Sequence, residues 1–203
     1  MKKCAGILLF LAIAVVAEAR GKAPQLAPGT YKGWGPDIDT IEIVKTFKAA
    51  DYDRVVVTPF DTSNAPLPDP KEKWYGTLKM MLAGYTEAFT EAFQKELKTK
   101  ADVKTADSAP KSAGTLIIRG SVADLDPGSR AGRYLVGYGT GGASTKATIE
   151  LVDAKSGDVL ARIKQARRSG GTWKVAGGSD LEVMRDAVHA LGKDIAHVVD
   201  AFQ

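Results

Sequence analysis

The sequence of 203 residues has very little of the side chains that bind metals or form disulfides: one cysteine, Cys4, and two histidines, His189 and His197. Beyond Cys4, a disulfide framework, a cysteine nucleophile and a cysteine metal ligand are excluded. The histidines lie on one predicted helix, about 12 Å apart along its axis, which is too far for both to bind one metal ion. We expect no metal and no cofactor.

Long apolar runs are also missing. The longest, around residues 7–16, is shorter than the roughly 20 residues that cross a bilayer as a helix. It follows Lys2 and Lys3 and precedes a small-x-small cleavage pattern at residues 17–19, so residues 1–19 are predicted to be a signal peptide. We expect a periplasmic or extracellular chain that begins at Arg20. Too few residues precede Cys4 for a lipoprotein signal, so no stable membrane anchor is expected after cleavage.

The remaining composition is that of an ordinary globular protein, with 44% hydrophobic and 26% charged residues. Prolines and glycines interrupt residues 20–39, which are predicted to form an extended arm or linker. Residues 40–203 are predicted to form a single α+β domain. This length suits one hydrophobic core.

Hydrophobic periodicity predicts the elements of that domain. Strands are expected at residues 54–60, 115–125, 144–152 and 158–166, and long helices at residues 73–98 and from Ser179 onward. The prediction is a mixed or antiparallel sheet of four to five strands with two long helices packed on it.

The last helix has the clearest pattern. Ser179 and Glu182 have the spacing of a capping box. Apolar residues then recur at steps of three and four, which places Leu191 and Ile195 in the middle of a buried stripe. We expect Lys193 and Asp194 to face water.

Two motifs resemble ligand-binding loops without meeting their requirements. The glycine tract at residues 137–142 lacks the lysine of a phosphate-binding loop and precedes a strand instead of a helix. We therefore interpret the tract as bulged or tightly bent strand geometry. Asp124 and Asp126 have the spacing of the first two ligands of a calcium-binding loop. The fifth and twelfth positions of that loop would be Gly128 and Leu135, which offer no side-chain oxygen, so a capped turn is expected.

Positive charge is concentrated in one region. Residues 111–178 contain 11 basic and 5 acidic side chains, whereas residues 20–110 contain 13 of each. Alternation predicts that cations on adjacent strands share the sheet face opposite the core. Two interpretations of that face are open. It is a solvated surface, or an edge protected against aggregation, or else it is a docking surface for an anionic partner. The candidate docking residues are Lys146, Arg162, Lys164, Arg167 and Arg168.

Three segments occur together in an order that resembles a known family. They are residues 55–60 (VVVTPF) before a long predicted helix, residues 133–143 (RYLVGYGTGGA) and residues 149–160 (IELVDAKSGDVL). Over most of residues 50–202 the chain resembles bacterial exported proteins of the domain-of-unknown-function 4410 family. The resemblance implies a small secreted or envelope protein, often a lipoprotein, without an established catalytic residue. The order of elements is also similar to that of TolB-amino-terminal-like and curli-export-like domains.

These observations favour a non-catalytic exported protein of the cell envelope, a protein- or glycan-binding accessory or assembly module. We expect its partner to be an envelope protein, an anionic glycan or a lipid head group. Nucleic acid is not expected, because the chain is predicted to be exported and its aromatic residues are not interleaved with the basic region. The alternative is a cell-envelope hydrolase that uses paired carboxylates.

Overall fold

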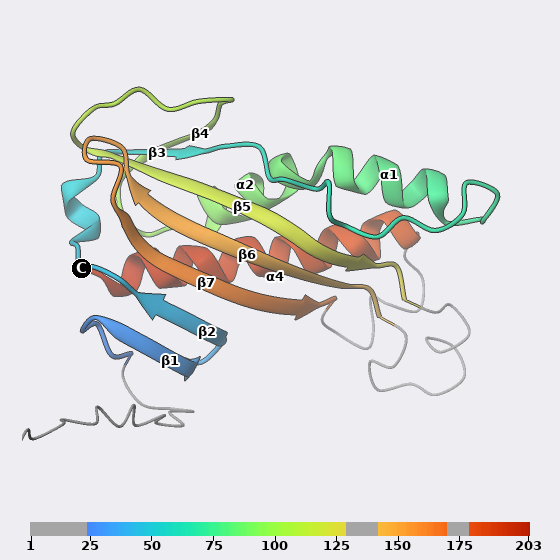
Figure 1. The fold of residues 1–203 in the computed structure, drawn as a ribbon, viewed down its shortest axis with the longest axis horizontal. Helices are drawn as coiled ribbons and strands as arrows, with labels where there is room; N and C mark the ends of the chain where they lie inside the picture. The colour runs from blue at the N-terminus through green and yellow to red at the C-terminus, as the bar shows by residue number, and fades with distance from the viewer. Residues whose placement is uncertain (1–23, 129–141, 170–178) are drawn as a thin grey trace, which may run out of the picture.

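The computed structural model describes residues 24–128, 142–169 and 179–203. These residues form one seven-stranded sheet and three α-helices, which lie on the same side of the sheet (Figure 1). The strands are β1 (Gly29–Trp34), β2 (Ile38–Ile43), β3 (Arg54–Val57), β4 (Asp102–Thr105), β5 (Thr115–Asp126), β6 (Ser144–Asp153) and β7 (Val159–Arg168). The helices are α1 (Tyr75–Ala83), α2 (Tyr85–Glu96) and α4 (Asp180–Ala201), with a short 3-10 helix at Ala49–Asp51.

The sheet is mixed and its order is β1-β2-β7-β6-β5-β3-β4. β3 runs parallel to β4 and β5, and the other neighbours are antiparallel. The prediction of four to five strands and two long helices is therefore wrong. The missing strands are β1, β2 and β4. β4 escapes sequence analysis because Val103 is the single buried residue among its four.

The sheet begins within the segment that we expected to be an arm or linker. Residues 29–43 form the β1–β2 hairpin, in which Tyr31 lies opposite Ile41. Gly33 and Gly35 have φ values of 61° and 59°, a left-handed conformation that glycine adopts without strain. The glycines that suggested a linker thus build a turn. Trp34 is buried and stacks on Phe202 near the end of the chain, with ring centroids 6.2 Å apart.

The first long helix is interrupted. We expected one helix over residues 73–98, but Gly84 separates α1 from α2 with φ −98° and ψ 14°. Its N–H donates to the carbonyl oxygens of Met80 and Leu82, as at a helix end. The apolar stripe continues across this break because Met81, Tyr85 and Phe89 are all buried.

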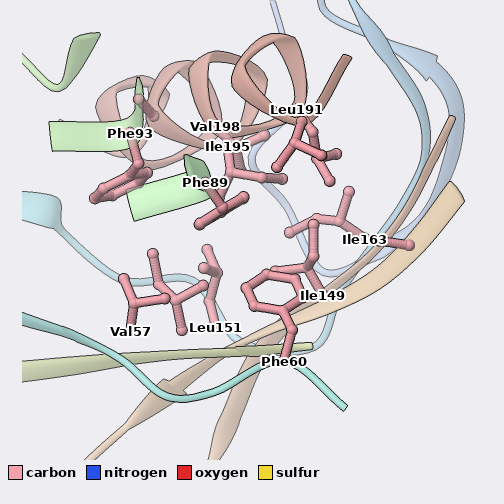
Figure 2. Close-up of a cluster of buried hydrophobic side chains, with 14 of the residues drawn as sticks. Val57, Phe60, Phe89, Phe93, Ile149, Leu151, Ile163, Leu191, Ile195 and Val198 are labelled. Atoms are coloured by element: carbon pink, nitrogen blue, oxygen red, sulfur yellow. The ribbon is translucent and has the colours of Figure 1, made fainter. Parts of the chain in front are cut away.

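α4 begins as its sequence predicts and lies along the core. The Ser179 hydroxyl accepts a hydrogen bond from the Glu182 N–H, and the Glu182 carboxylate accepts one from the Ser179 N–H. Leu191 and Ile195 are fully buried, and Figure 2 shows their side chains pointing toward the strands. Lys193 is exposed, as expected. No helix in the described ranges is long and apolar enough to cross a membrane.

α4 and α2 approach closely at one glycine. A Cβ atom on Gly192 would lie 2.5 Å from the carbonyl oxygen of Phe89 and 3.1 Å from the Cβ of Ala92. Any side chain at Gly192 would therefore separate the two helices. This contact brings α2 over the strands, and the helices leave the opposite face of the sheet open.

Candidate docking surface on the open face of the sheet

The open face presents the polar residues of β2, β7, β6 and β5. Along β6 and β7 the apolar side chains of Ile149, Leu151 and Ile163 are buried toward the helices. Lys146, Arg162 and Lys164, at the alternating positions, are exposed. The structure therefore brings these three predicted residues together on one face of the sheet.

Charges in the middle of this face alternate in sign. Four residues in register across four strands form a row that we call the ionic ladder: Arg119 of β5, Glu150 of β6, Arg162 of β7 and Glu42 of β2. Successive members form ion pairs, at 2.7 Å from Arg119 to Glu150, 3.0 Å from Glu150 to Arg162 and 3.1 Å from Arg162 to Glu42. Arginine and glutamate thus alternate along this row.

The ladder also shifts the pKa values of Glu150 and Arg162. Partial burial raises the pKa of Glu150, but hydrogen bonds from Arg119 and Arg162 outweigh that effect, and the pKa of this carboxyl is lowered overall. Hydrogen bonds to Glu42 and Glu150 raise the pKa of Arg162. Glu150 and Arg162 are therefore charged at neutral pH, and their ion pairs with Arg119 and Glu42 lie within the chain.

Two further candidate residues are also paired. Lys146 lies 3.2 Å from Asp124 across the β5–β6 pair. Arg167 donates to the Asp194 carboxylate and to the carbonyl oxygen of Asp37, whose carboxylate lies 3.2 Å away. Both cations are therefore engaged within the chain.

Lys164 and Arg168 differ from the other candidates. Both are exposed, and neither forms an ion pair with a carboxylate in the described part of the chain. Lys164 lies between Thr40 of β2 and Thr148 of β6. We call the set of residues in register with it the open row: Lys32, Thr40, Lys164, Thr148 and Ser121.

A depression of about 550 Å³ lies at one end of the open face, where the end of β5, the start of β6 and the end of β7 line it. Its charged lining residues are Asp39, Asp124, Asp126, Lys146, Arg167 and Arg168. Among these described residues, three are acidic and three are basic. Arg168 is the lining cation with no ion pair to a described residue.

Behind this depression, a buried network joins the sheet to α4. Asp194 is 6% exposed, so the prediction that it faces water is wrong. Its carboxylate accepts hydrogen bonds from Arg167 and from the Gln165 amide, at 2.9 Å for the latter. Burial raises the pKa of Asp194, and the guanidinium of Arg167 opposes that shift. The Gln165 amide also donates to the carbonyl oxygen of Asp37 and so fixes the β1–β2 turn.

The sequence did not reveal the partners in this network, nor the place of Glu42 in the ladder. Asp194 follows the charged helix positions Lys193 and Asp186, and nothing local distinguishes it from them. A signal for Glu42 was present, because Thr40 and Glu42 alternate with Ile41 and Ile43.

The two histidines of the described ranges have local partners. In these ranges no three His, Cys, Asp or Glu side chains are grouped so that they could hold a metal ion. His197 pairs with Glu96 at 3.0 Å on the helix side. The Asp126 side chain accepts a hydrogen bond from the Gly128 N–H, which confirms the capped turn. Residues 137–141 of the glycine tract lie outside the described residues.

The architecture is thus a mixed sheet covered on one face by helices. The family model described as "Domain of unknown function (DUF4410)" matches residues 55–171, and the chain belongs to that family. This confirms the resemblance found in the sequence. No curated protein matches the chain.

Several solved structures are similar to the chain at low sequence identity. The PelC dodecamer from Paraburkholderia phytofirmans is 14% identical, with 75% of this chain and 96% of that chain covered and a TM-score of 0.45. Protein XCC0632 from Xanthomonas campestris is 12% identical, with coverages of 77% and 91% and a TM-score of 0.40. Lipoprotein GNA1162 from Neisseria meningitidis is 17% identical, with coverages of 71% and 98% and a TM-score of 0.29. The seven-stranded mixed sheet with three helices replaces the expected TolB-like topology.

Proposed function

We propose that this protein is a non-catalytic accessory or assembly module of the bacterial cell envelope that binds an anionic partner through the open face of its sheet. One observation carries the proposal. Lys164 and Arg168 are exposed cations without a carboxylate partner among the described residues, on a face where Arg119, Arg162 and Lys146 each have one.

This difference determines which cations attract a partner. A ligand that binds Arg162 has to compete with Glu42 and Glu150, which already accept its hydrogen bonds. Lys164 has hydroxyl-bearing neighbours on both adjacent strands, about 5 Å away. Its positive charge is therefore available to an anionic group, and the adjacent hydroxyls provide further hydrogen bonds.

The envelope location is part of the same proposal. The signal-peptide pattern at residues 1–19 supports it. Membership of the family also supports it, because the resemblance to that family implies an exported protein. Amino-terminal sequencing of the protein from its native host tests it. A chain that begins at Arg20 supports export, and a chain that retains Lys2 and Lys3 contradicts it.

Binding is tested with the double variant Lys164→Gln and Arg168→Gln. Three immobilised probes distinguish the possible anions: a carboxylated polysaccharide, vesicles that contain phosphatidylglycerol, and envelope protein extract. We expect one probe to retain the wild-type protein, less strongly as salt rises from low to physiological, because exposed charges are screened over about 8–10 Å. Retention should fall about tenfold in the double variant, the effect of roughly 1.4 kcal/mol.

The matched control is Arg119→Gln. It removes an exposed arginine from the same face, but one that is already paired with Glu150. It should therefore retain the wild-type binding. Equal losses in the control and the double variant would mean that net charge alone matters, and unchanged binding in the double variant would place the docking surface elsewhere.

A further inference from the structure

An apolar groove lies on the helix side of the molecule, where the α1–α2 junction meets the start of α4. Its volume is about 250 Å³, and Met80, Met81 and Leu181 contribute to its lining. The described residues include four exposed large hydrophobic side chains, and two of them are here: Met80 is 60% exposed and Leu181 is 38% exposed. This clustering distinguishes the groove from the scattered apolar residues of an ordinary surface.

Gly84 lines the same groove and has no internal reason to be glycine. A Cβ atom there would meet only the carbonyl oxygen of Met80, at an ordinary contact distance of 3.7 Å. Its φ of −98° is accessible to other residues. At Gly120 and Gly192, by contrast, a Cβ would lie 2.5 Å from a neighbouring atom. The missing side chain at Gly84 therefore lowers the wall of the groove without improving packing inside the chain.

The two sides of the groove carry opposite charges. Glu87 comes from α2 and Arg185 from α4. The Glu87 carboxylate has no hydrogen bond or ion pair with another described residue. Arg185 donates to Glu91 at 2.5 Å and to His189 at 3.3 Å through Nη2 and Nε, which leaves Nη1 without a bond to a described residue. One unpaired acid and one partly available guanidinium thus flank the apolar centre.

We propose that a second copy of this chain docks on this groove about a two-fold axis. In a two-fold contact the same patch meets itself, so Glu87 of one copy faces Arg185 of the other on both sides of the axis. The flexible thioether of each Met80 inserts beside Gly84 of the opposite copy. Because the groove is small, the association is expected to be weak. The open face of the sheet stays free, and this inference does not rest on the proposed function.

Cross-linking tests whether the two grooves meet. In a Cys4→Ser background, Met80→Cys places a single thiol at the groove, and Leu67→Cys places one at another exposed apolar site. A short bismaleimide should link two copies of the Met80→Cys variant and leave the Leu67→Cys variant unlinked. Equal cross-linking of both variants, or none in the Met80→Cys variant, overturns the proposal.

A charge exchange tests the two-fold geometry by sedimentation equilibrium. Glu87→Arg and Arg185→Glu should each weaken self-association about tenfold, because each places like charges opposite one another. The double variant restores opposite charges and should return to within about threefold of the wild-type dissociation constant. Gly84→Ala should also weaken association while the chain stays folded. A wild-type chain that remains monomeric at millimolar concentration, or a double variant no better than the single ones, overturns the proposal.

Discussion

The face of the sheet beneath the helices carries Ile149 and Ile163, both fully buried, whereas the open face of the same strands carries Glu150 and Arg162 in register across four strands. On the covered face, contacts depend on shape, and a methyl group too many or too few changes the packing. On the open face, the ion pairs are partly exposed to water and salt, and the contacts depend on which charges lie opposite one another on adjacent strands. The same β-strands therefore support a face that determines stability and a face available for recognition.

The largest expected effect is on the covered face. Leu191→Ala removes a fully buried side chain from the middle of α4 and should lower the free energy of unfolding by about 2–5 kcal/mol. Urea denaturation measures it. The matched control is Leu181→Ala on the same helix, at a concentration where the chain is monomeric, and its loss should stay below about 1 kcal/mol because Leu181 is 38% exposed. Similar losses in both variants would mean that α4 is not anchored by its buried stripe.

An intermediate effect is expected where the two faces are joined. Asp194→Ala leaves the guanidinium of Arg167 and the amide of Gln165 without their shared acceptor. Removing one partner of a buried ion pair costs about 3–5 kcal/mol, but Arg167 is partly exposed, so we expect about 1–3 kcal/mol. Asp194→Asn keeps an acceptor and relieves the burial of charge, and it should cost less than half as much. Thermal denaturation of the two variants separates the contributions of charge and hydrogen bonding.

The smallest effect is expected on the open face, and it depends on pH. The pKa of Glu150 is lowered in the folded chain, so the unfolded chain binds a proton more readily. The stabilisation is present above the ordinary pKa of about 4.3 and is lost as the pH falls through the lowered value. Glu150→Gln should cost about 1 kcal/mol at pH 7 and much less near pH 3. Glu42→Gln, which removes one contact of the ladder instead of two, should cost less; a loss independent of pH and salt would contradict the ion-pair account.

The sequence predicted those elements whose patterns are local. The capping box of Ser179 and Glu182, and the alternation of residues 144–152, each depend on neighbours a few residues apart. Strand β4 could not be predicted in the same way, because it forms by pairing with β3 and only Val103 shows its buried side. The conformation at Gly33 and Gly35 could not be predicted, because glycines occur both in flexible linkers and in tight turns.

The candidate surface was predicted in part for the same reason. Alternation placed Lys146, Arg162 and Lys164 on one face, but it gave no register between distant strands. Glu42 therefore could not be matched to Arg162, from which it is separated by 120 residues. Asp194 was predicted to face water because the apolar stripe of a helix shows only which angular positions are hydrophobic. That stripe contains no information about Arg167, a partly buried residue of a distant strand that pairs with Asp194.

The position of β2 between β1 and β7 has a consequence for the order in which the chain folds. The pairing of β1 with β2 is local and can form once Ile43 has been synthesised, but the next strand in the sheet, β7, is complete only at Arg168. During synthesis the second strand therefore has an unsatisfied hydrogen-bonding edge while more than half of the chain is made. Joining such distant strands is slow, because the loop between them must close first. A chain that stops before β7 keeps that edge exposed and is prone to pair with other chains.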